Sequence, residues 1–372
     1  MSHRPRVLLL IPHLGGGGAE QVTALLAAGL SREKYELHLA LISHHALAPT
    51  IMPSGIRIHQ LGAHRVRSAI PQLLRLVRQL KPDLMLSTMA HLNFLVLLLR
   101  PFFSVRTRIL VRQNGTVSAA LASDPHRRFT ALLYRFLYPR ADRVICQTSA
   151  MAEDMYAEIS IPKKQLAVLA NPIDVEHLRA TSGRPSQSAT GSPGPHLLAV
   201  GRLVDDKGFD LLLRALVTVR EALPGTQLFL AGSGSEEPAL KALCSQLDLG
   251  SAVFFLGHVA HPSAWYSDAT LFVLSSRHDA MPNALLEAAA CGLPIVATPA
   301  SQGLVDLLQN QPGVWLADGV SEHALSAALL RALGQLSPAQ RFPHPFIEPF
   351  RLPHAINAYE DLIDATLRER PL

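Results

Sequence analysis

The chain has 372 residues, of which 48% are apolar and 17% are charged, and its formal net charge is +5. This length and apolar content predict two domains with hydrophobic cores of their own. The three cysteines, Cys146, Cys244 and Cys291, show no paired spacing, so the sequence indicates neither a disulfide framework nor a zinc site and is consistent with the reducing cytosol. The apolar runs Val7–Ile11 and Leu92–Leu99 are too short to span a bilayer.

The first half of the chain alternates short apolar runs with amphipathic stretches, which is typical of a doubly wound α/β domain. The expected strands are Arg6–Ile11, Glu36–Leu41, Leu84–Ser87, Arg108–Val111, Arg143–Gln147 and Leu166–Leu169. The expected helices are Ala19–Leu30, Ile70–Lys81, Leu92–Arg100, Asp124–Tyr138 and Ser149–Glu158. Residues 1–180 are therefore predicted to form an N-terminal Rossmann-like domain.

A segment rich in Ser, Gly and Pro at residues 181–195 predicts a linker, and a second α/β pattern follows it. Its expected strands are His196–Val200, Gln227–Ala231, Val253–Leu256, Leu271–Leu274 and Ile295–Ala297. Its expected helices are Gly208–Ala222, Glu237–Leu247 and Asn283–Ala290. Residues 196–345 are predicted to form a second Rossmann-like domain, and residues 346–372 a crossover segment that ends in the amphipathic helix Ala355–Arg368.

Positive charge is concentrated in the first half, where residues 1–180 hold 22 Lys and Arg against 11 Asp and Glu, while the remainder holds 12 against 18. The asymmetry predicts an anionic partner for the first half. A peripheral membrane surface facing anionic lipid and ordinary solvated helix faces explain the charge equally well. Nucleic acid is a weaker explanation, because no recognition motif accompanies the charge. The basic residues concerned are Arg65, Arg67, Arg75, Arg78, Lys81, Arg100, Arg106, Arg108, Arg127, Arg128, Arg135 and Arg140.

The most informative segment runs from Ser275 to Thr298 and has the pattern of a strand end, a polar loop, a helix, a turn and a strand. The carboxylates of Asp279 and Glu287 lie on either side of a helix start marked by Pro282. Open α/β sheets bind ligands at the carboxyl ends of their strands, and the free N–H groups of a helix start attract phosphate. The segment therefore predicts a site for a phosphorylated ligand.

This segment resembles the signature of the retaining glycosyltransferases of family 4, also called group 1. That signature is Glu, seven residues and Glu, followed by Ala-x-x-Gly-x-Pro and two Val or Ile residues. Asp279 and Ala280 stand where the family has Glu and Gly; the matching residues are Glu287, Ala289, Gly292, Pro294, Ile295 and Val296. The resemblance extends over nearly the whole chain and implies the GT-B fold, with two Rossmann-like domains facing a cleft and a C-terminal helix crossing back to the first.

The resemblance also implies donor-binding and catalytic residues. In this family an Arg and a Lys after the first strand of the second domain hold the nucleotide diphosphate, which implies Arg202 and Lys207 here. Fixed cations stabilise the negative charge that grows on a leaving diphosphate. Glu287 would accept the ribose hydroxyls, and Asp279 would contact the transferred sugar. The alternatives are a salt bridge of the two cations with neighbouring aspartates, and a helix N-cap function for Asp279.

Glycine loops and a helix start supply further donor-binding candidates. The four glycines at residues 15–18 follow the first strand and resemble the family's loop that faces donor phosphate and acceptor, although a flexible turn is the alternative. Gly-x-Gly at residues 232–234 and Leu-Gly-x-Val at residues 256–259 resemble two further family elements, whose alternative is a purely structural function. The candidates are Gly16, Gly17, Gly232, Val259, Met281, Pro282 and Asn283.

Two polar segments of the first domain follow strands and supply acceptor-binding candidates. His91 and Asn93 open a helix after the strand at residues 84–87, and Arg112 and Asn114 follow the next strand. Together with Gly17, they are expected to orient the acceptor. His91 is also the candidate for a base-like catalytic function, although a single histidine at a helix start is more often structural.

These features predict a retaining glycosyltransferase that moves a hexose or N-acetylhexosamine from a nucleotide diphosphate sugar to a hydroxyl of a lipid-linked or polysaccharide acceptor. A UDP-sugar is favoured over GDP-mannose as donor. No Asp-x-Asp motif is present, so neither a metal nor another cofactor is expected. The expected location is the cytoplasm, with peripheral attachment to the inner face of the membrane as one interpretation. The alternatives are a nucleotide-sugar epimerase of the same fold and, because of Asp279 and Ala280, a nucleotide-binding pseudoenzyme.

Overall fold

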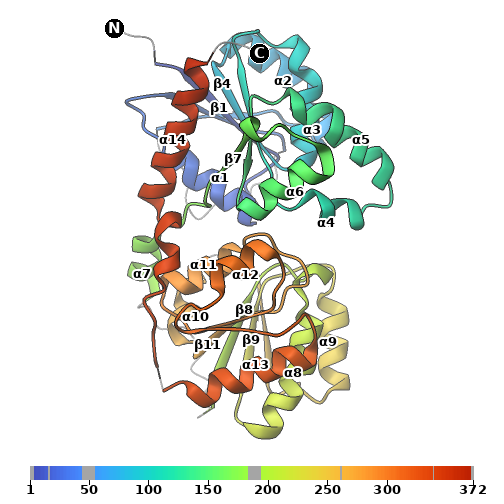
Figure 1. The fold of residues 1–372 in the computed structure, drawn as a ribbon, viewed down its shortest axis with the longest axis vertical. Helices are drawn as coiled ribbons and strands as arrows, with labels where there is room; N and C mark the ends of the chain where they lie inside the picture. The colour runs from blue at the N-terminus through green and yellow to red at the C-terminus, as the bar shows by residue number, and fades with distance from the viewer. Residues whose placement is uncertain are drawn as a thin grey trace. The chain divides into compact units, whose positions relative to one another are not determined.

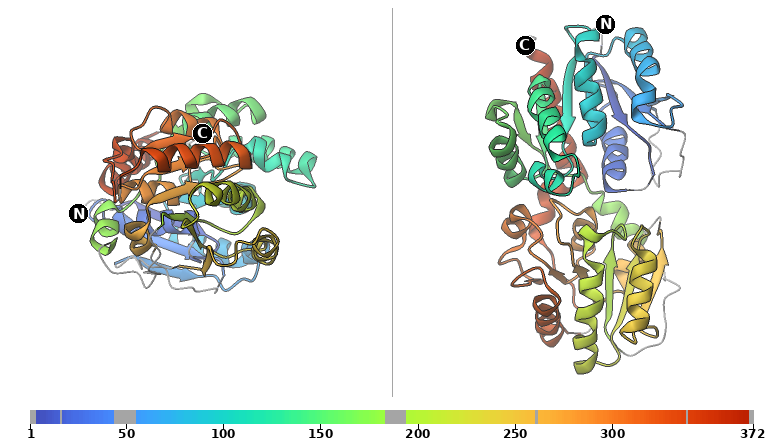
Figure 2. Two further views of the ribbon diagram at one scale, coloured as in Figure 1. Left: turned by 90° about the horizontal axis from the view of Figure 1, so that it is seen from below. Right: turned by 90° about the vertical axis from the view of Figure 1, so that its right-hand side faces the viewer.

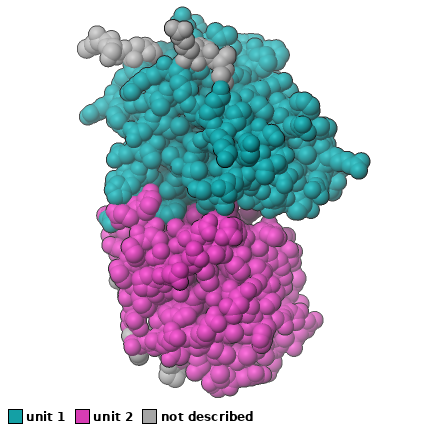
Figure 3. All heavy atoms as spheres, viewed as in Figure 1, with its two compact units in different colours: residues 1–172, 350–372 teal, residues 173–349 magenta. Residues whose placement is uncertain are grey.

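The computed structural model describes residues 4–15, 17–43, 55–182, 194–259, 262–337 and 339–369. The chain divides into two compact units, coloured separately in Figure 3. Unit 1 comprises Met1–Pro172 and Phe350–Leu372, and unit 2 comprises Ile173–Pro349. The change from unit 1 to unit 2 lies between Pro172 and Ile173, and residues 183–193 of the expected linker lie outside the described residues.

Unit 1 contains a seven-stranded sheet in the order β3-β2-β1-β4-β5-β6-β7, and its neighbouring strands are parallel. The strands are β1 (Arg6–Ile11), β2 (Glu36–Leu41), β3 (Arg57–Gln60), β4 (Leu84–Thr88), β5 (Arg108–Arg112), β6 (Arg143–Cys146) and β7 (Leu166–Val168). The strand order reverses between β1 and β4. This switch point is where sheets of this kind bind ligands, outside the carboxyl ends of the strands.

Helices surround the sheet of unit 1 (Figure 1). They are α1 (Gly18–Gly29), α2 (Ile70–Leu80), α3 (Ala90–Leu99), α4 (Val117–Ala122), α5 (Arg127–Leu137), α6 (Ser149–Ile159) and α14 (Leu352–Arg368). Alternate residues of β1, namely Val7, Leu9 and Ile11, share one buried cluster with residues of α1 and α14. These two helices, far apart in the sequence, therefore cover the same face of the sheet.

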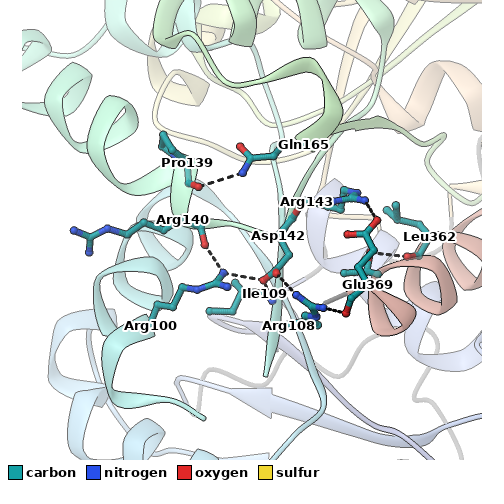
Figure 4. Close-up of polar contacts among 11 residues, drawn as sticks. Arg100, Arg108, Ile109, Pro139, Arg140, Asp142, Arg143, Gln165, Leu362 and Glu369 are labelled. Carbon is teal, nitrogen blue, oxygen red and sulfur yellow. Dashed lines mark hydrogen bonds and ion pairs between the residues drawn. The ribbon is translucent and has the colours of Figure 1, made fainter. Parts of the chain in front are cut away.

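The last helix of the chain returns to unit 1, as the predicted crossover requires. Ile356, Tyr359 and Ile363 of α14 are buried in the core of unit 1, and the Glu360 carboxylate accepts a hydrogen bond of 2.8 Å from the backbone N–H of Ser31. Figure 4 shows the polar contacts beyond its C-terminal end, where Arg143 pairs with Glu369.

Buried charges next to this helix end are paired. Asp142 is 1% exposed and accepts hydrogen bonds from Arg100 at 2.8 Å, Arg108 at 2.9 Å and the backbone of Ile109 at 2.8 Å (Figure 4). Arg108 also donates to the carbonyl oxygen of Glu369. These contacts join β5, the start of β6 and the end of α14. Removing one of the charged partners would leave another buried charge uncompensated.

Unit 2 contains a six-stranded parallel sheet in the order β10-β9-β8-β11-β12-β13. The strands are β8 (His196–Val200), β9 (Gln227–Ala231), β10 (Val253–Gly257), β11 (Leu271–Leu274), β12 (Ile295–Ala297) and β13 (Val314–Leu316). Here the strand order reverses between β8 and β11, which places a second switch point beside their carboxyl ends.

Helices pack against this sheet as well, and Figure 2 shows them from two further sides. They are α7 (Val175–Ser182), α8 (Phe209–Ala222), α9 (Glu237–Gln246), α10 (Ser263–Asp268), α11 (Asn283–Ala290), α12 (Gln302–Leu308) and α13 (Glu322–Gln335). A single buried cluster joins apolar residues of α8, α9 and α13 to alternate residues of β8 and β9. Both units therefore have cores of their own.

The predicted doubly wound α/β architecture is confirmed, and the differences lie in short elements. The sequence analysis did not predict β3, whose residues Arg57–Gln60 are polar and partly exposed at a sheet edge, or β13, which has three residues. The edge strand β3 lacks the continuous apolar run that marks strands buried on both faces, whereas β13 is apolar but only three residues long. It also did not predict α4, α7, α10, α12 and α13.

Candidate functional site

Two loops of unit 2 lie together at the carboxyl ends of the adjacent strands β8 and β11. The first contains Arg202 and ends in a 3₁₀ turn at Asp205–Lys207, and the second leads from Ser275 to the start of α11. The Ser275 hydroxyl donates a hydrogen bond of 2.8 Å to the carbonyl oxygen of Lys207. The structure thereby brings together the two segments that carry the predicted donor-binding residues.

Lys207 and Asp279 form an ion pair across these loops. The Lys207 side chain is 22% exposed and that of Asp279 is 12% exposed, so water screens the pair only in part. The expected alternative for Lys207 was a salt bridge with a neighbouring aspartate, and the structure instead pairs it with a residue 72 positions away. A phosphate group that binds Lys207 would therefore compete with the Asp279 carboxylate.

Arg277 holds the two loops in place. Its guanidinium donates two hydrogen bonds of 2.7 Å to the carboxylate of Asp210, and its backbone N–H donates to the carbonyl oxygen of Asp206 at 2.7 Å. The hydrogen bond from Arg277 is the main cause that lowers the pKa of Asp210. Arg202, by contrast, is exposed, and within the described part of the chain its side chain has no ion pair or hydrogen bond. Its guanidinium is available to an anion.

Gly232 allows the loop after β9 to approach the loop after β8 closely. Its φ is +149°, and a Cβ added there would lie 1.8 Å from the carbonyl oxygen of Gly201. The backbone N–H of Leu203 donates to the carbonyl oxygen of Ser233 at 3.0 Å, which fixes the spacing. Glycine is therefore required at this position by backbone contact. Val259, at the end of the loop after β10, is partly buried.

Glu287 is 4% exposed and lies on α11, where its Oε2 accepts a hydrogen bond of 2.8 Å from the hydroxyl of Tyr266. Tyr266 is fully buried on α10, and this burial, followed by the charge of Glu287, raises its pKa well above the usual value. Tyr266 therefore stays protonated and donates. Its hydrogen bond fixes one carboxylate oxygen of Glu287 in a defined position.

Asp279 does not cap α11, which was the alternative function expected for this residue. Pro282 is the N-cap residue, with φ −74°, and no side chain caps the helix. Met281 is buried, while Asn283, the first helical residue, is partly buried. The backbone of these three residues thus begins the helix directly after the Asp279 loop, as the sequence pattern predicts.

The switch point of unit 1 carries a histidine pair and a carboxylate. His13 follows β1, and its Nδ1 lies 3.7 Å from Oε1 of Glu20 on α1. His91 is the second residue of α3, after β4; desolvation, followed by repulsion from His13, lowers its pKa. Gly17 is the N-cap of α1, and a Cβ there would lie 2.5 Å from Oε2 of Glu20. Gly16 lies outside the described residues.

The other acceptor-side candidates form a buried network. Arg112 is 2% exposed, and its guanidinium donates to the side-chain oxygens of Asn114 and Asn171. Asn93 is fully buried and donates to the carbonyl oxygen of Arg112 at 3.0 Å and to the hydroxyl of Tyr138 at 3.2 Å. These contacts favour a positioning function for Asn93 and Arg112, whereas Asn114 is partly exposed.

Sequence reasoning missed Tyr266, Arg277 and His13 as parts of these sites. Tyr266 precedes Glu287 by 21 positions and belongs to no recognised motif, so only its hydrogen bond to Glu287 in the folded chain reveals it. His13 carried a usable signal, because it lies two residues after the end of the first strand, where ligand-binding loops begin.

No helix among the described residues is both long and apolar enough to cross a membrane. Within the same residues, no group of three or more His, Cys, Asp or Glu side chains is arranged to hold a metal ion.

Both units match known protein families. Residues 17–172 match the family described as "Glycosyl transferase 4-like domain", and residues 194–335 match the family described as "Glycosyl transferases group 1". The two matches cover most of unit 1 and most of unit 2 respectively, including the loops that carry Arg202, Lys207 and Asp279.

Characterised relatives align over most of the chain. One from Campylobacter jejuni, the N-acetylgalactosamine-N,N'-diacetylbacillosaminyl-diphospho-undecaprenol 4-alpha-N-acetylgalactosaminyltransferase, is 27% identical over 336 residues, which cover 86% of this chain and 88% of that protein. The amylovoran biosynthesis glycosyltransferase AmsD of Erwinia amylovora is 23% identical over 308 residues, which cover 82% of this chain and 84% of that protein.

Solved structures share the fold. Anabaena Alr3699/HepE in complex with UDP and glucose superposes with a TM-score of 0.80 at 17% identity, covering 98% of this chain and 100% of that one. Sucrose-phosphate synthase from Thermosynechococcus elongatus superposes with a TM-score of 0.78 at 18% identity, covering 97% of this chain and 100% of that one. These similarities show the GT-B fold.

Proposed function

The chain belongs to the group 1 glycosyltransferases, also called family 4, and on that basis we propose that it transfers a hexose or N-acetylhexosamine with retention of configuration from a nucleotide diphosphate sugar to a hydroxyl. The observation that carries this proposal is the convergence of Arg202, Lys207 and the Asp279 loop at the switch point of unit 2. Two cations and a helix start at the carboxyl ends of parallel strands suit a diphosphate.

We propose the following donor contacts. Arg202 and Lys207 bind the diphosphate and stabilise the charge that grows on it as the glycosidic bond breaks. Glu287, oriented by Tyr266, accepts hydrogen bonds from the ribose diol. Once the donor phosphate binds the Lys207 ammonium group, the Asp279 carboxylate leaves Lys207 and contacts the transferred sugar. The remaining proposed donor residues come from the glycine loop of unit 1, from the loops after β9 and β10, and from the start of α11: Gly16, Gly17, Gly232, Val259, Met281, Pro282 and Asn283.

In the proposed reaction the acceptor hydroxyl attacks the anomeric carbon on the face from which the diphosphate leaves. The departing phosphate oxygen takes the proton of the attacking hydroxyl, so the charge and the proton end on the nucleoside diphosphate. This assignment needs no protein nucleophile and gives no step to a metal or other cofactor. His91, whose pKa is lowered by desolvation and by repulsion from His13, and Asn114 would orient the hydroxyl by hydrogen bonding.

A UDP-sugar is the preferred donor and a lipid-linked or polysaccharide glycan the preferred acceptor. The donor preference is supported by the UDP complex of the structural neighbour, and the acceptor preference by the activities for which the Campylobacter and Erwinia relatives are named. Because these relatives are transferases, the comparisons do not favour the epimerase or pseudoenzyme alternatives. GDP-mannose is the second candidate donor, and a cytoplasmic location suits either nucleotide sugar.

Calorimetric titration of the full chain with UDP, GDP, ADP and dTDP tests the proposal. We expect one nucleotide, UDP first, to bind with at least a tenfold preference, and Arg202→Ala to weaken it at least tenfold, as loss of a charge-assisted contact predicts. Arg331→Ala, which removes an exposed arginine of α13, is the control and should bind as the unmodified chain does. Absence of binding to all four nucleotides would overturn the proposed function.

A further inference from the structure

Exposed apolar side chains gather on one part of unit 1. Nine large apolar residues are substantially exposed in the described part of the chain, and six of them lie between α3 and the end of α5. These six are Leu98 (54%), Phe102 (61%), Val105 (82%), Phe129 (63%), Leu132 (51%) and Phe136 (63%). Scattered single residues of this kind need no explanation, but a cluster indicates a binding surface. We call these six residues, with the exposed arginines around them, the α3–α5 surface.

On α5 the exposed apolar residues form one stripe. Phe129, Leu132 and Phe136 are spaced by three and four positions, which places them on one side of the helix. Tyr134 and Leu137 are buried on the opposite side, against unit 1. The apolar stripe is therefore presented to solvent rather than to the core.

The exposed residues of α3 and of the turn that follows it lie beside the end of α5. The ring of Phe94 on α3 lies 4.8 Å from that of Tyr134 and 5.8 Å from that of Tyr138, and Leu98 follows one helical turn later. Arg100 donates to the carbonyl oxygen of Arg140, which links the two segments directly (Figure 4). The helices α3 and α5 lie side by side in Figure 1 and contact one another, so the exposed residues that they carry lie in the same region of unit 1.

The charge of the chain segment that carries this surface is almost entirely positive. Residues 91–141 contain eight arginines and one acidic residue, Asp124, whose carboxylate is hydrogen-bonded to Thr130 and to the backbone N–H of His126. Two of the arginines are buried and one is partly buried. The exposed arginines are Arg106, Arg127, Arg128, Arg135 and Arg140. On α5, Arg128 and Arg135 are seven positions apart and lie along one side of the apolar stripe.

A surface that combines exposed aromatic rings with arginines is complementary to a partner that has both apolar and negatively charged groups. Rings can enter the boundary between headgroups and acyl chains, while guanidinium groups bind lipid phosphates. A second copy of the chain would bring like charges together, which opposes self-association through this face. We infer that the α3–α5 surface binds an anionic phospholipid bilayer. This inference goes beyond the proposed reaction, because it requires neither a donor nor an acceptor.

The contrast with α2 gives a matched control. Arg75 and Arg78 are exposed on α2, in the same unit, and no exposed large apolar side chain accompanies them on that helix. Arg75→Gln/Arg78→Gln and Arg128→Gln/Arg135→Gln change the net charge of the chain equally. Any difference between them in lipid binding therefore reports the place of the charges and not their number.

Sedimentation of the full chain with vesicles tests the inference. One set of vesicles contains phosphatidylcholine alone, and the other contains about one third phosphatidylglycerol. We expect binding to the anionic vesicles only, weakened about tenfold or more by Arg128→Gln/Arg135→Gln and by Phe129→Ser/Phe136→Ser, and weakened less than threefold by the α2 variant.

Three results would overturn the inference: no binding to anionic vesicles, equal binding to both vesicle types, or equal loss in the two arginine variants. UDP binding of each variant, measured in solution, separates these results from misfolding and from failure of the proposed function. The substituted side chains are exposed, so the variants should bind UDP as the unmodified chain does.

Discussion

The hydroxyl of Tyr266 lies 2.8 Å from Oε2 of Glu287, and both side chains are buried in unit 2. A buried carboxylate needs hydrogen-bond donors to remain charged and in one position. Tyr266 supplies one such donor from α10, an element that carries no recognised motif. The proposed ribose contact of Glu287 therefore depends on a residue outside the family signature.

Tyr266→Phe should weaken UDP binding about tenfold, because it removes the donor that orients the Glu287 carboxylate but keeps the ring. Its effect on 2′,3′-dideoxy-UDP should be less than threefold, since that analogue has no ribose diol. Calorimetry with both nucleotides checks this. Equal losses for the two nucleotides would show that Tyr266 acts on the fold of the site and not through the diol.

Asp279→Asn should increase the stabilisation that UDP gives to the chain. Without the carboxylate, Lys207 has lost its ion-pair partner, so the ligand-free variant should be less stable and a bound diphosphate should replace the missing anion. Thermal unfolding with and without UDP measures the difference. Asp205→Asn, which neutralises an exposed carboxylate nearby, is the control. An unchanged UDP-induced shift in Asp279→Asn would contradict competition between Asp279 and phosphate.

Gly232→Ala should destabilise unit 2 by more than about 2 kcal/mol, because the new Cβ would collide with the carbonyl oxygen of Gly201 in a backbone region that favours glycine. Gly250→Ala adds a Cβ with no atom within 4 Å and should change stability little. Chemical unfolding of the two variants compares them. Similar stabilities would mean that the loop after β9 moves aside without cost.

The stability of the chain should fall as the pH drops below about 6.5, the usual pKa of histidine. His38 is buried and its Nδ1 lies 2.9 Å from Nε2 of His59, so one of these nitrogens must be unprotonated. Burial lowers the pKa of both rings, and repulsion from His59 lowers that of His38 further. The unfolded chain therefore binds these protons first. The free energy of unfolding is highest above pH 6.5, decreases between pH 6.5 and the lowered pKa values, and levels off below them.

Unfolding by urea at neutral and mildly acidic pH measures this dependence. His59→Gln should reduce the loss on acidification without abolishing it, because the pKa of the buried His344 is also lowered by burial. His126→Gln, which replaces an exposed histidine, should leave the dependence unchanged. The same pH dependence in all three proteins would exclude the His38–His59 pair as its source.

The amino-acid sequence by itself determined the central strands, the alternating architecture and the family. Strands such as β8 and β12 are buried on both faces of a parallel sheet, so their apolar runs are continuous and end at glycine, proline or polar residues. The helix α11 was located to the residue because Pro282 and Cys291–Gly292 mark its ends. These signals are local, so they can be recognised in a single amino-acid sequence.

Only the tertiary structure decided which side chains meet. The order of strands places β8 beside β11, which brings Lys207 to Asp279 across 72 positions, and the packing of α10 brings Tyr266 to Glu287. The tertiary structure also buries Asn93 and Arg112 in the core and leaves Phe129 and Phe136 exposed to solvent. The physical reason is that a local hydrophobic pattern predicts which face of a strand or helix is buried. The pairing of distant polar groups depends instead on strand order and helix packing, which no local pattern encodes.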